Sequence, residues 1–394
     1  MNLFNIALKN TFHKPLNAVL SIVLVAFSVG LIAVLQYAYN QITQKFQTNI
    51  AGIDMVVGAK GSPLQLVLSA LFQVDAPTGN ISWADAQKIA RHKLVRTAIP
   101  LAYGDSYQNY KIVGSDSQYI AHFGVKIAKG RLFSQDFEVC VGAEIAEKYQ
   151  LKIGSQFYST HGSQNAEENQ HKANSYTVVG ILQPTQSLLN QLVVCNLGSV
   201  WRVHQHEGEQ AEPPEITAML LKFKTPMALM QLPRYVNTST NLQAALPNIE
   251  INRLLTLLGV GESALTALAW LIMLVSGISI FIAVFNNVQQ RRPELALMRI
   301  MGAQPWQLGV LVLFEAIFLV LFGYGIGILC SRVALFALAQ QVAENFQYQF
   351  NSFFMLQPNE LILLAACFFV AILAAILPAV LAYFTPIAQA INHE

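Results

Sequence analysis

Four apolar segments constrain this chain more than any other feature. They cover residues 16–35, 264–285, 308–330 and 361–384. A helix rises about 1.5 Å per residue, so about 20 residues can cross a hydrocarbon layer of roughly 30 Å. Over the 394 residues, 54% are hydrophobic and 12% are charged, against roughly 25% charged in an average soluble protein. We therefore expect a membrane protein with four transmembrane helices.

The first apolar segment is expected to stay as an anchor. Its apolar core is longer than the roughly 7–15 residues of a signal peptide, and no A-x-A cleavage site follows. Before it, residues 1–14 place Leu3, Phe4, Ala7 and Leu8 at helical spacing. This pattern predicts an amphipathic interfacial helix, with a frayed chain end as the alternative.

The basic residues beside the spans predict the topology. One side carries Lys9, Lys14, Arg291, Arg292 and Arg299. The loop over about 335–359 carries none, and Arg332 is the one basic residue at that end. Short cytoplasmic loops are enriched in Lys and Arg. We expect both termini and the 291–308 segment in the cytoplasm of a cell whose inner membrane the chain crosses several times.

The expected order of parts follows from these spans. It is an amphipathic helix (1–14), a first span (15–38), an extracytoplasmic α+β domain with a helical stalk (39–262), a second span (263–288), a cytoplasmic helix (289–306), a third span (307–333), a short outer loop (334–359), a fourth span (360–385) and a cytoplasmic tail (386–394).

The outer domain alternates predicted strands and helices. Strands are expected at 54–58, 111–115, 138–142, 155–159, 176–182, 191–195 and 216–223. Helices are expected at 83–94, with Ser82 as N-cap, and at 143–151, and as extensions of the spans over 36–50 and 248–263. Polar loops are expected at 161–175 and 204–215.

No motif of catalysis can be found. The Gly-rich run VVGAKGSPLQ (56–65) lacks the G-x-x-x-x-G-K-[ST] order of a phosphate loop, and we expect a turn with Pro63 opening a helix. His204 and His206 have poor metal-ligand spacing, so a solvated loop is favoured. Cys140 and Cys195 either form a disulfide or, as favoured, are two buried thiols. With a net charge of +2, we expect no nucleic-acid partner. Because no catalytic or ATPase motif is found, we expect the chain to be no enzyme and to hold no cofactor or metal.

Polar and small residues within the third span suggest helix contacts. Glu315 is an ionisable group inside a span, which is costly and often functional. Packing against a neighbouring helix and a role in coupling both fit it. Gly323 and Gly327 have the small-x-x-x-small spacing of close helix packing, within the chain or against a second subunit.

The segment RRPELALMRIMGAQPWQL (291–308) predicts a short capped helix between two spans. Pro293 fits a first turn, Glu294 the positive helix end and Arg299 the negative end. Gly302 fits a left-handed C-terminal position, and Pro305 starts the next helix. A helical connector that only fixes topology is the alternative to a rigid helix that receives force from a soluble partner.

This segment resembles the coupling helix of MacB/FtsX/LolC-type ABC transporter permeases. Residues 314–327 and 376–391 are similar to the family's last two spans, and 123–157 and 176–184 to its periplasmic core domain. The resemblance implies that ATPase coupling falls to Arg291, Arg292, Glu294, Leu295, Met298, Arg299 and Gly302. It implies packing or coupling roles for Glu315, Gly323 and Gly327.

The resemblance also implies partners and a mechanism. They are two copies of a separate cytoplasmic ABC ATPase, a second permease subunit in a homo- or heterodimer, membrane lipid and a periplasmic partner protein. ATP hydrolysis would then move the periplasmic domain to export or extract a lipoprotein, lipid or peptide by mechanotransmission. The alternatives are an FtsX-like regulator that activates a periplasmic partner without transport and a stand-alone sensor.

Overall fold

The computed structural model describes residues 3–11, 15–74, 76–160, 170–185, 187–203, 213–346 and 358–384. The chain divides into two compact units. One combines Met1–Gln41 with Leu257–Glu394, and the other is Ile42–Thr256. The predicted α+β domain corresponds to the second unit.

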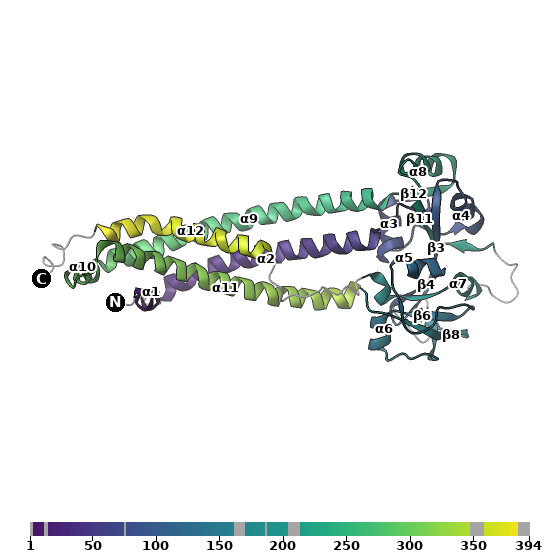
Figure 1. Cartoon of the computed structure of the whole chain (residues 1–394), viewed down its shortest axis with the longest axis horizontal. Helices are drawn as coiled ribbons and strands as arrows, with labels where there is room; N and C mark the ends of the chain where they lie inside the picture. The colour runs from purple at the N-terminus through teal and green to yellow at the C-terminus, as the bar shows by residue number, and fades with distance from the viewer. Residues whose placement is uncertain are drawn as a thin grey trace. The chain divides into compact units, whose positions relative to one another are not determined.

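The first unit is a bundle of long helices (Figure 1). It contains α1 (Leu3–Thr11), α10 (Arg292–Ile300), α11 (Pro305–Phe346) and α12 (Pro358–Tyr383), together with the larger parts of α2 (Pro15–Ile50) and α9 (Pro247–Gln290), whose other ends belong to the second unit. Four of these, α2, α9, α11 and α12, are long and apolar enough to cross a membrane. This confirms the predicted fold of four spans, and the continuity of α2 and α9 confirms the helical extensions over 36–50 and 248–263.

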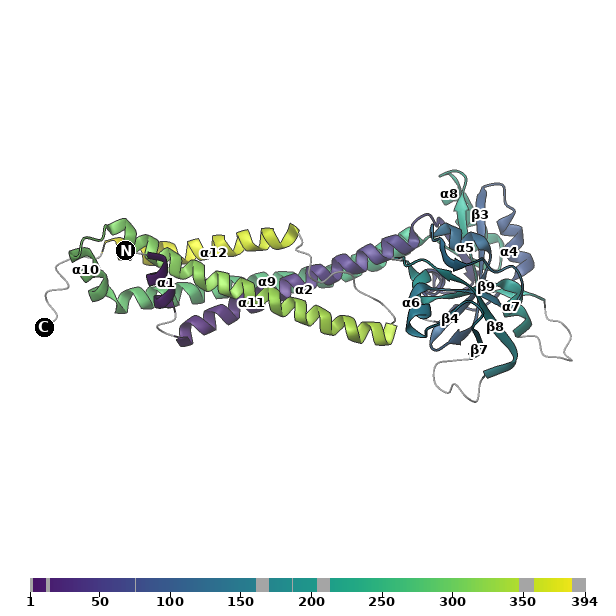
Figure 2. The ribbon, with the colours of Figure 1, turned by 60° about the horizontal axis from the view of Figure 1, so that its bottom comes forward.

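The N-terminal helix α1 lies against the bundle (Figure 2). The ring centroids of Phe4 in α1 and Phe318 in α11 are 4.9 Å apart in an edge-to-face arrangement. Ala7 is fully buried in the same apolar core as residues of α2, α9, α11 and α12. The predicted amphipathic helix is therefore present, and its apolar side contacts other helices.

The second unit is built on a mixed sheet. The sheet contains ten strands, in the order β12-β1-β11-β3-β4-β9-β6-β8-β5, with β7 paired to β3 and β8. Its strands are β1 (Met55–Ala59), β3 (Val95–Tyr107), β4 (Tyr110–Ser115), β5 (Ile127–Gly130), β6 (Glu138–Val141), β7 (Gln156–Thr160), β8 (Gln170–Leu182), β9 (Val193–Asn196), β11 (Ala218–Phe223) and β12 (Leu242–Ala245). A separate pair joins β2 (Ile81–Ser82) and β10 (Glu215–Ile216).

Short helices cover the sheet. They are α3 (Pro63–Phe72), α4 (Trp83–Ala90), α5 (Ser117–His122), α6 (Ala143–Lys148), η1 (Leu188–Gln191), α7 (Leu197–Val203) and α8 (Ala228–Ser239). Successive residues of one strand belong to different buried clusters, one on each face of the sheet, as with Met55 and Val56 in β1. Because both faces of the sheet are buried, its strands are continuous apolar runs rather than alternating ones.

Strand register decides the state of Cys140 and Cys195. Strands β6 and β9 pair antiparallel, with Cys140 opposite Val194 and Cys195 opposite Val139. A shift of one residue places side chains on opposite faces of a sheet, and the two cysteines do belong to the two opposite clusters. Both are buried free thiols, as favoured, and burial raises the pKa of Cys140 to about 11.

Pairing between strands corrects several predicted boundaries. The loop expected over 161–175 is wrong for its second part, because β8 begins at Gln170 and continues the ladder with β7. The helix expected over 83–94 ends at Ala90, since β3 begins at Val95. Ser82 belongs to β2, and its side chain makes no capping hydrogen bond in the part of the chain that the structure describes.

Three other sequence predictions have different outcomes. Pro63 does open α3, whose N-cap Ser62 accepts a hydrogen bond from Gln65 N at 3.4 Å, so the Gly-rich run is a turn before a helix. His204 and His206 lie outside the described residues. The helix expected over 143–151 ends at Lys148.

Candidate functional site

Helix α10 begins with a proline in its first turn and ends in a hydrogen-bonded C-terminal cap, while its N-cap residue Arg291 makes no side-chain capping bond among the described residues. Proline stands in its first turn, with Glu294 beside it. At the other end, Gly302 N donates to Arg299 O at 3.0 Å and Ala303 N to Met298 O at 3.0 Å. This is the double hydrogen bond of a Schellman motif, and Gly302 adopts the required left-handed backbone at φ +98°. A separate helix therefore stands between α9 and α11, as the sequence predicts.

The two sides of α10 differ in exposure. Leu295 is 3% exposed, and Met298 packs partly buried on the bundle core. The outward side carries the exposed apolar side chains Leu297, Ile300 and Met301, and Trp306 at the start of α11 is also exposed. Of the predicted coupling set, Leu295 and Met298 therefore hold the helix to the bundle. The outward apolar residues were missed, although helical periodicity around Leu295 could have located them.

The charges of α10 are also divided between inside and outside. Arg291 Nε lies 2.7 Å from Glu294 Oε2, and Arg291 Nη1 lies 3.4 Å from Glu315 Oε1. The side chain of Arg291 is 14% exposed and that of Glu294 is 57% exposed. The mostly buried side chain of Arg291 thus contacts two carboxylates of the same chain, whereas the side chain of Glu294 is largely exposed to solvent.

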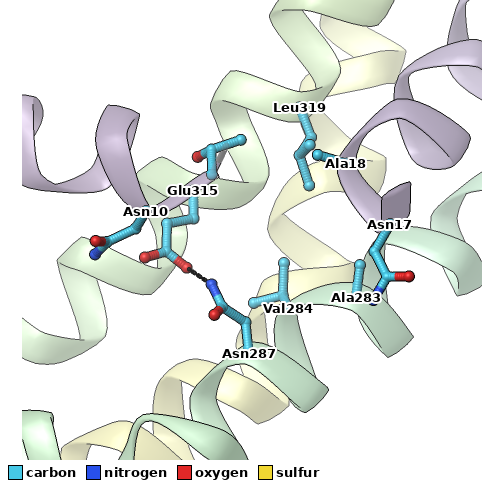
Figure 3. Close-up of a pocket in the computed structure, with 9 residues that line it drawn as sticks. Asn10, Asn17, Ala18, Ala283, Val284, Asn287, Glu315 and Leu319 are labelled. Carbon is cyan, nitrogen blue, oxygen red and sulfur yellow. Dashed lines mark hydrogen bonds between the residues drawn. The ribbon is translucent and has the colours of Figure 1, made fainter. Parts of the chain in front are cut away.

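Glu315 is buried in the bundle beside a small polar cavity (Figure 3). Asn287 Nδ2 donates to Glu315 Oε2 at 3.0 Å. The cavity has a volume of about 30 Å³, and its polar lining comes from Asn10, Thr11, Asn17, Asn287 and Glu315. The asparagines were not predicted. The sequence does contain a signal for them, because all three are polar residues within or beside apolar segments. Asn287 also lies four residues before Arg291.

Gly323 and Gly327 are at a close contact within the chain. A Cβ atom on Gly323 would lie 2.6 Å from Val25 Cβ, and one on Gly327 would lie 2.7 Å from Ala26 O. Both neighbours belong to α2. The two glycines therefore let α11 approach α2, which selects the packing partner that the sequence left open.

A second buried ion pair joins α11 to α12. Arg332, on α11, pairs with Glu360, on α12. Tyr324 OH donates to the backbone oxygen of Glu360 at 3.0 Å, and Arg332 lies 5.7 Å from the ring centroid of Tyr37 in α2. In the sequence analysis, Arg332 was only an exception to the rule that basic residues mark the cytoplasmic side. Its partner Glu360 was not predicted.

The bundle, its charged helix and the β-rich domain inserted between the first two spans define a class of membrane permeases. Comparison with protein families makes this specific. Residues 18–231 match the family model for the MacB-like periplasmic core domain, and residues 266–394 match that for the FtsX-like permease C-terminal region. The chain belongs to the MacB/FtsX-type permease family, and so to the permease components of ABC transporters.

The solved structures that match this chain are distant from it in sequence. The periplasmic region of MacB from Actinobacillus actinomycetemcomitans is 14% identical, with a TM-score of 0.35, over 54% of this chain and 98% of that one. The extracellular domain of the ABC-type transporter YknZ from Gram-positive bacteria is 12% identical, with a TM-score of 0.31, over 48% and 98%. A domain of a permease protein from Porphyromonas gingivalis is 13% identical, with a TM-score of 0.29, over 50% and 89%. Comparison with curated proteins found no match.

Metal chemistry has no candidate within the described ranges. They contain no group of three or more His, Cys, Asp or Glu side chains that could hold an ion. The buried acidic side chains Glu315 and Glu360 instead contact Arg291 and Arg332.

Proposed function

We propose that this chain is the permease subunit of a mechanotransmission-type ABC transporter. In this proposal a separate ATPase, in two copies, binds α10, and ATP hydrolysis moves the extracytoplasmic domain to export or extract a lipoprotein, lipid or peptide. The observation that carries the proposal is α10 itself. It is a capped helix with one side fixed to the bundle and an exposed apolar side beside Glu294.

The connections of α10 support transmission of force. It follows α9 after one residue and precedes α11 after a short turn. Helix α9 is continuous from Gln290 back to Pro247, which belongs to the domain unit. A rigid helix joined in this way can pass a displacement along the chain without a flexible linker. A connector needed only for topology would not require a separate helix with its own C-terminal cap at Gly302.

The outward side of α10 also supports a protein partner. Exposed apolar groups rimmed by a charge are typical of protein–protein contact sites. Leu297, Ile300 and Met301 supply the apolar groups, and Glu294 supplies the charge. We place this side, and both termini, in the cytoplasm. A cysteine at Gln289 should then resist an impermeant thiol reagent in intact cells, and its labelling from outside would contradict this topology.

Charge reversal at α10 tests the proposed ATPase contact. Glu294→Lys and Arg292→Glu should abolish co-purification of the ATPase or its stimulated ATP turnover, because like charges at an interface are costly. Membrane levels should stay near normal, since an exposed charge at a helix end contributes only about 0.3–1 kcal/mol to the helix. Glu147→Lys, at an exposed position of the domain unit, is the matched control. Wild-type yield and turnover in the Glu294→Lys complex would reject the coupling role.

The second permease subunit is placed at a groove between α9 and α12. The groove has a volume of about 550 Å³ and an apolar lining that includes Trp270, Leu274, Ile278, Phe369 and Leu373. Gly277 lies at its floor, where an added Cβ atom would lie 2.8 Å from Val370 Cγ1. In this proposal a helix of the second subunit occupies the groove, with membrane lipid as the alternative occupant.

A periplasmic partner protein is the remaining part of the proposal. The domain unit exposes Met227, Leu229, Met230 and Tyr235 on and beside α8. Methionine-rich surfaces adapt well to varied partners. The same surface would serve an FtsX-like regulator that activates a periplasmic enzyme. Movement of a substrate by the reconstituted complex alone would favour transport, whereas activation of a bound enzyme without such movement would favour regulation.

A further inference from the structure

Glu315 lies where several segments distant in sequence meet. Asn287, near the end of α9, donates to one carboxylate oxygen at 3.0 Å, and Arg291, at the α9–α10 junction, lies 3.4 Å from the other. Asn10 of α1 and Asn17 of α2 line the cavity beside it (Figure 3). One acidic side chain on α11 therefore lies beside polar residues of α1, α2 and α9 and of the α9–α10 junction.

The ion pairs form a path from the outward side of α10 to the interior. Arg291 contacts both Glu294 on α10 and Glu315 on α11. Exposure of the side chains falls along this path, from 57% for Glu294 to 14% for Arg291 and 5% for Glu315. A displacement of Glu294 can thus be passed through Arg291 to the buried side chain of Glu315.

A buried carboxylate needs such partners. An ionised group in an apolar bundle is costly unless it is paired and hydrogen-bonded. Within the described residues, Asn287 Oδ1 is buried without a hydrogen-bond donor. The adjoining cavity of about 30 Å³ is large enough for one water molecule. A water there would satisfy Asn287, which is already oriented by its bond to Glu315.

We propose that Glu315 is a positioning residue that holds α10 in one orientation against the bundle through Arg291 and Asn287. Without this contact, α10 would remain a helix but would separate more often from α11. Its consequence for ATP-driven movement rests on the proposed function. The positioning itself does not, and it can be measured on the purified chain without any partner.

Trypsin can report this positioning, because Arg299 lies in α10 and stays unchanged in every variant. Cleavage within a helix requires local opening, and its rate follows the population of the open form when opening is fast. In detergent, Glu315→Gln and Arg291→Gln should each raise cleavage after Arg299 by about tenfold or more, since hydrogen bonds to charged groups are among the strong ones. Arg291→Gln removes the same contact from outside the bundle core, should Glu315→Gln fold poorly.

The matched control is Glu360→Gln. It makes the same substitution at a second buried acidic side chain that pairs with an arginine of another segment, Arg332. Cleavage after Arg299 should stay at the wild-type rate. An unchanged rate in Glu315→Gln and Arg291→Gln, or an equal rise in Glu360→Gln, would overturn the proposal.

A second measurement separates this inference from the proposed function. In the complex with the ATPase, Glu315→Gln should keep co-purification but lose most stimulation of ATP turnover, whereas Glu294→Lys should lose both. If no ATPase binds the wild-type chain, the proposed function fails while the trypsin result still decides the positioning role. Full stimulation in Glu315→Gln, together with faster cleavage, would limit Glu315 to positioning without transmission and contradict the proposed path.

Discussion

Arg332 and Glu360 form a buried ion pair that joins α11 to α12 inside the helix bundle. Tyr37 of α2 lies beside Arg332, so the pair also contacts a third helix. Glu360 is 6% exposed, and its backbone oxygen accepts a hydrogen bond from Tyr324. Both ion pairs involve α11. Glu315, which pairs with Arg291, lies nearer the start of this helix, and Arg332 lies nearer its end.

Removal of one member of this pair should be more harmful than removal of both. Arg332→Leu leaves a buried carboxylate without its partner, and such a change typically costs about 3–5 kcal/mol. The double variant Arg332→Leu/Glu360→Leu leaves no buried charge and should recover much of the loss. Thermal unfolding of the purified chain in detergent checks this. A double variant less stable than either single one would show that the ion pair is not the source of the effect.

The glycines of α11 should differ sharply in their tolerance of a side chain. Gly327→Ala should destabilise the bundle by about 1–3 kcal/mol, as overpacking does, because its Cβ atom would lie 2.7 Å from Ala26 O. Gly325→Ala is the control on the same helix, since a Cβ atom there has no neighbour within 4 Å among the described residues. The midpoints of thermal unfolding should fall only for Gly327→Ala. Equal midpoints would refute close packing of α2 on α11.

Cysteine cross-linking should locate the second permease subunit. Leu274→Cys lies in the groove between α9 and α12, whereas Leu329→Cys is an exposed position on α11 outside it. In a background without the native cysteines, oxidation in membranes should yield a dimer for Leu274→Cys and little for Leu329→Cys. A dimer of equal yield for both would point to random collision, and a dimer only for Leu329→Cys would move the interface to α11.

The domain unit should lose stability in acid through Glu138. Hydrogen bonds from Arg131 and from the Ser134 backbone lower the pKa of Glu138 to about 2, from an ordinary value of 4.5. A depressed carboxyl pKa contributes stability that is present above pH 4.5 and is lost as the pH falls toward 2. Glu138→Gln should therefore be less stable than wild type at pH 7, and the difference should narrow over this window. A constant difference from pH 7 to pH 2 would contradict the assignment.

The sequence predicts the helical parts better than the contacts between them. Span length and apolar content locate α2, α9, α11 and α12, because these are local properties. The ends of α10 are also set by local sequence, with Pro293 in the first turn and Gly302 in the C-terminal cap. The residue that binds Arg332 lies 28 positions away on another helix. Such pairing depends on the packing of helices, which a single sequence does not specify.

In the candidate site too, local features could be predicted from the sequence, whereas contacts between distant residues could not. Sequence motifs found Glu294 and Glu315 but not Asn287, whose role comes only from its 3.0 Å contact with Glu315. Cys140 and Cys195 are a similar case. Both occur in predicted strands, but the register that places them on opposite faces is a pairing between distant segments. The coupling function of the α10 residues stays a prediction that the proposed variants can test.

The placement of two ion pairs on α11 limits how this helix can move. Glu315 and Arg332 lie about 25 Å apart along the helix axis at 1.5 Å per residue, and each binds a different neighbouring element. Sliding α11 along its axis would separate both pairs together and leave the buried carboxylates of Glu315 and Glu360 without their arginines. A tilt about one end breaks only the pair at the other end. Helix α11 is therefore better suited to tilt about one end than to slide along its axis.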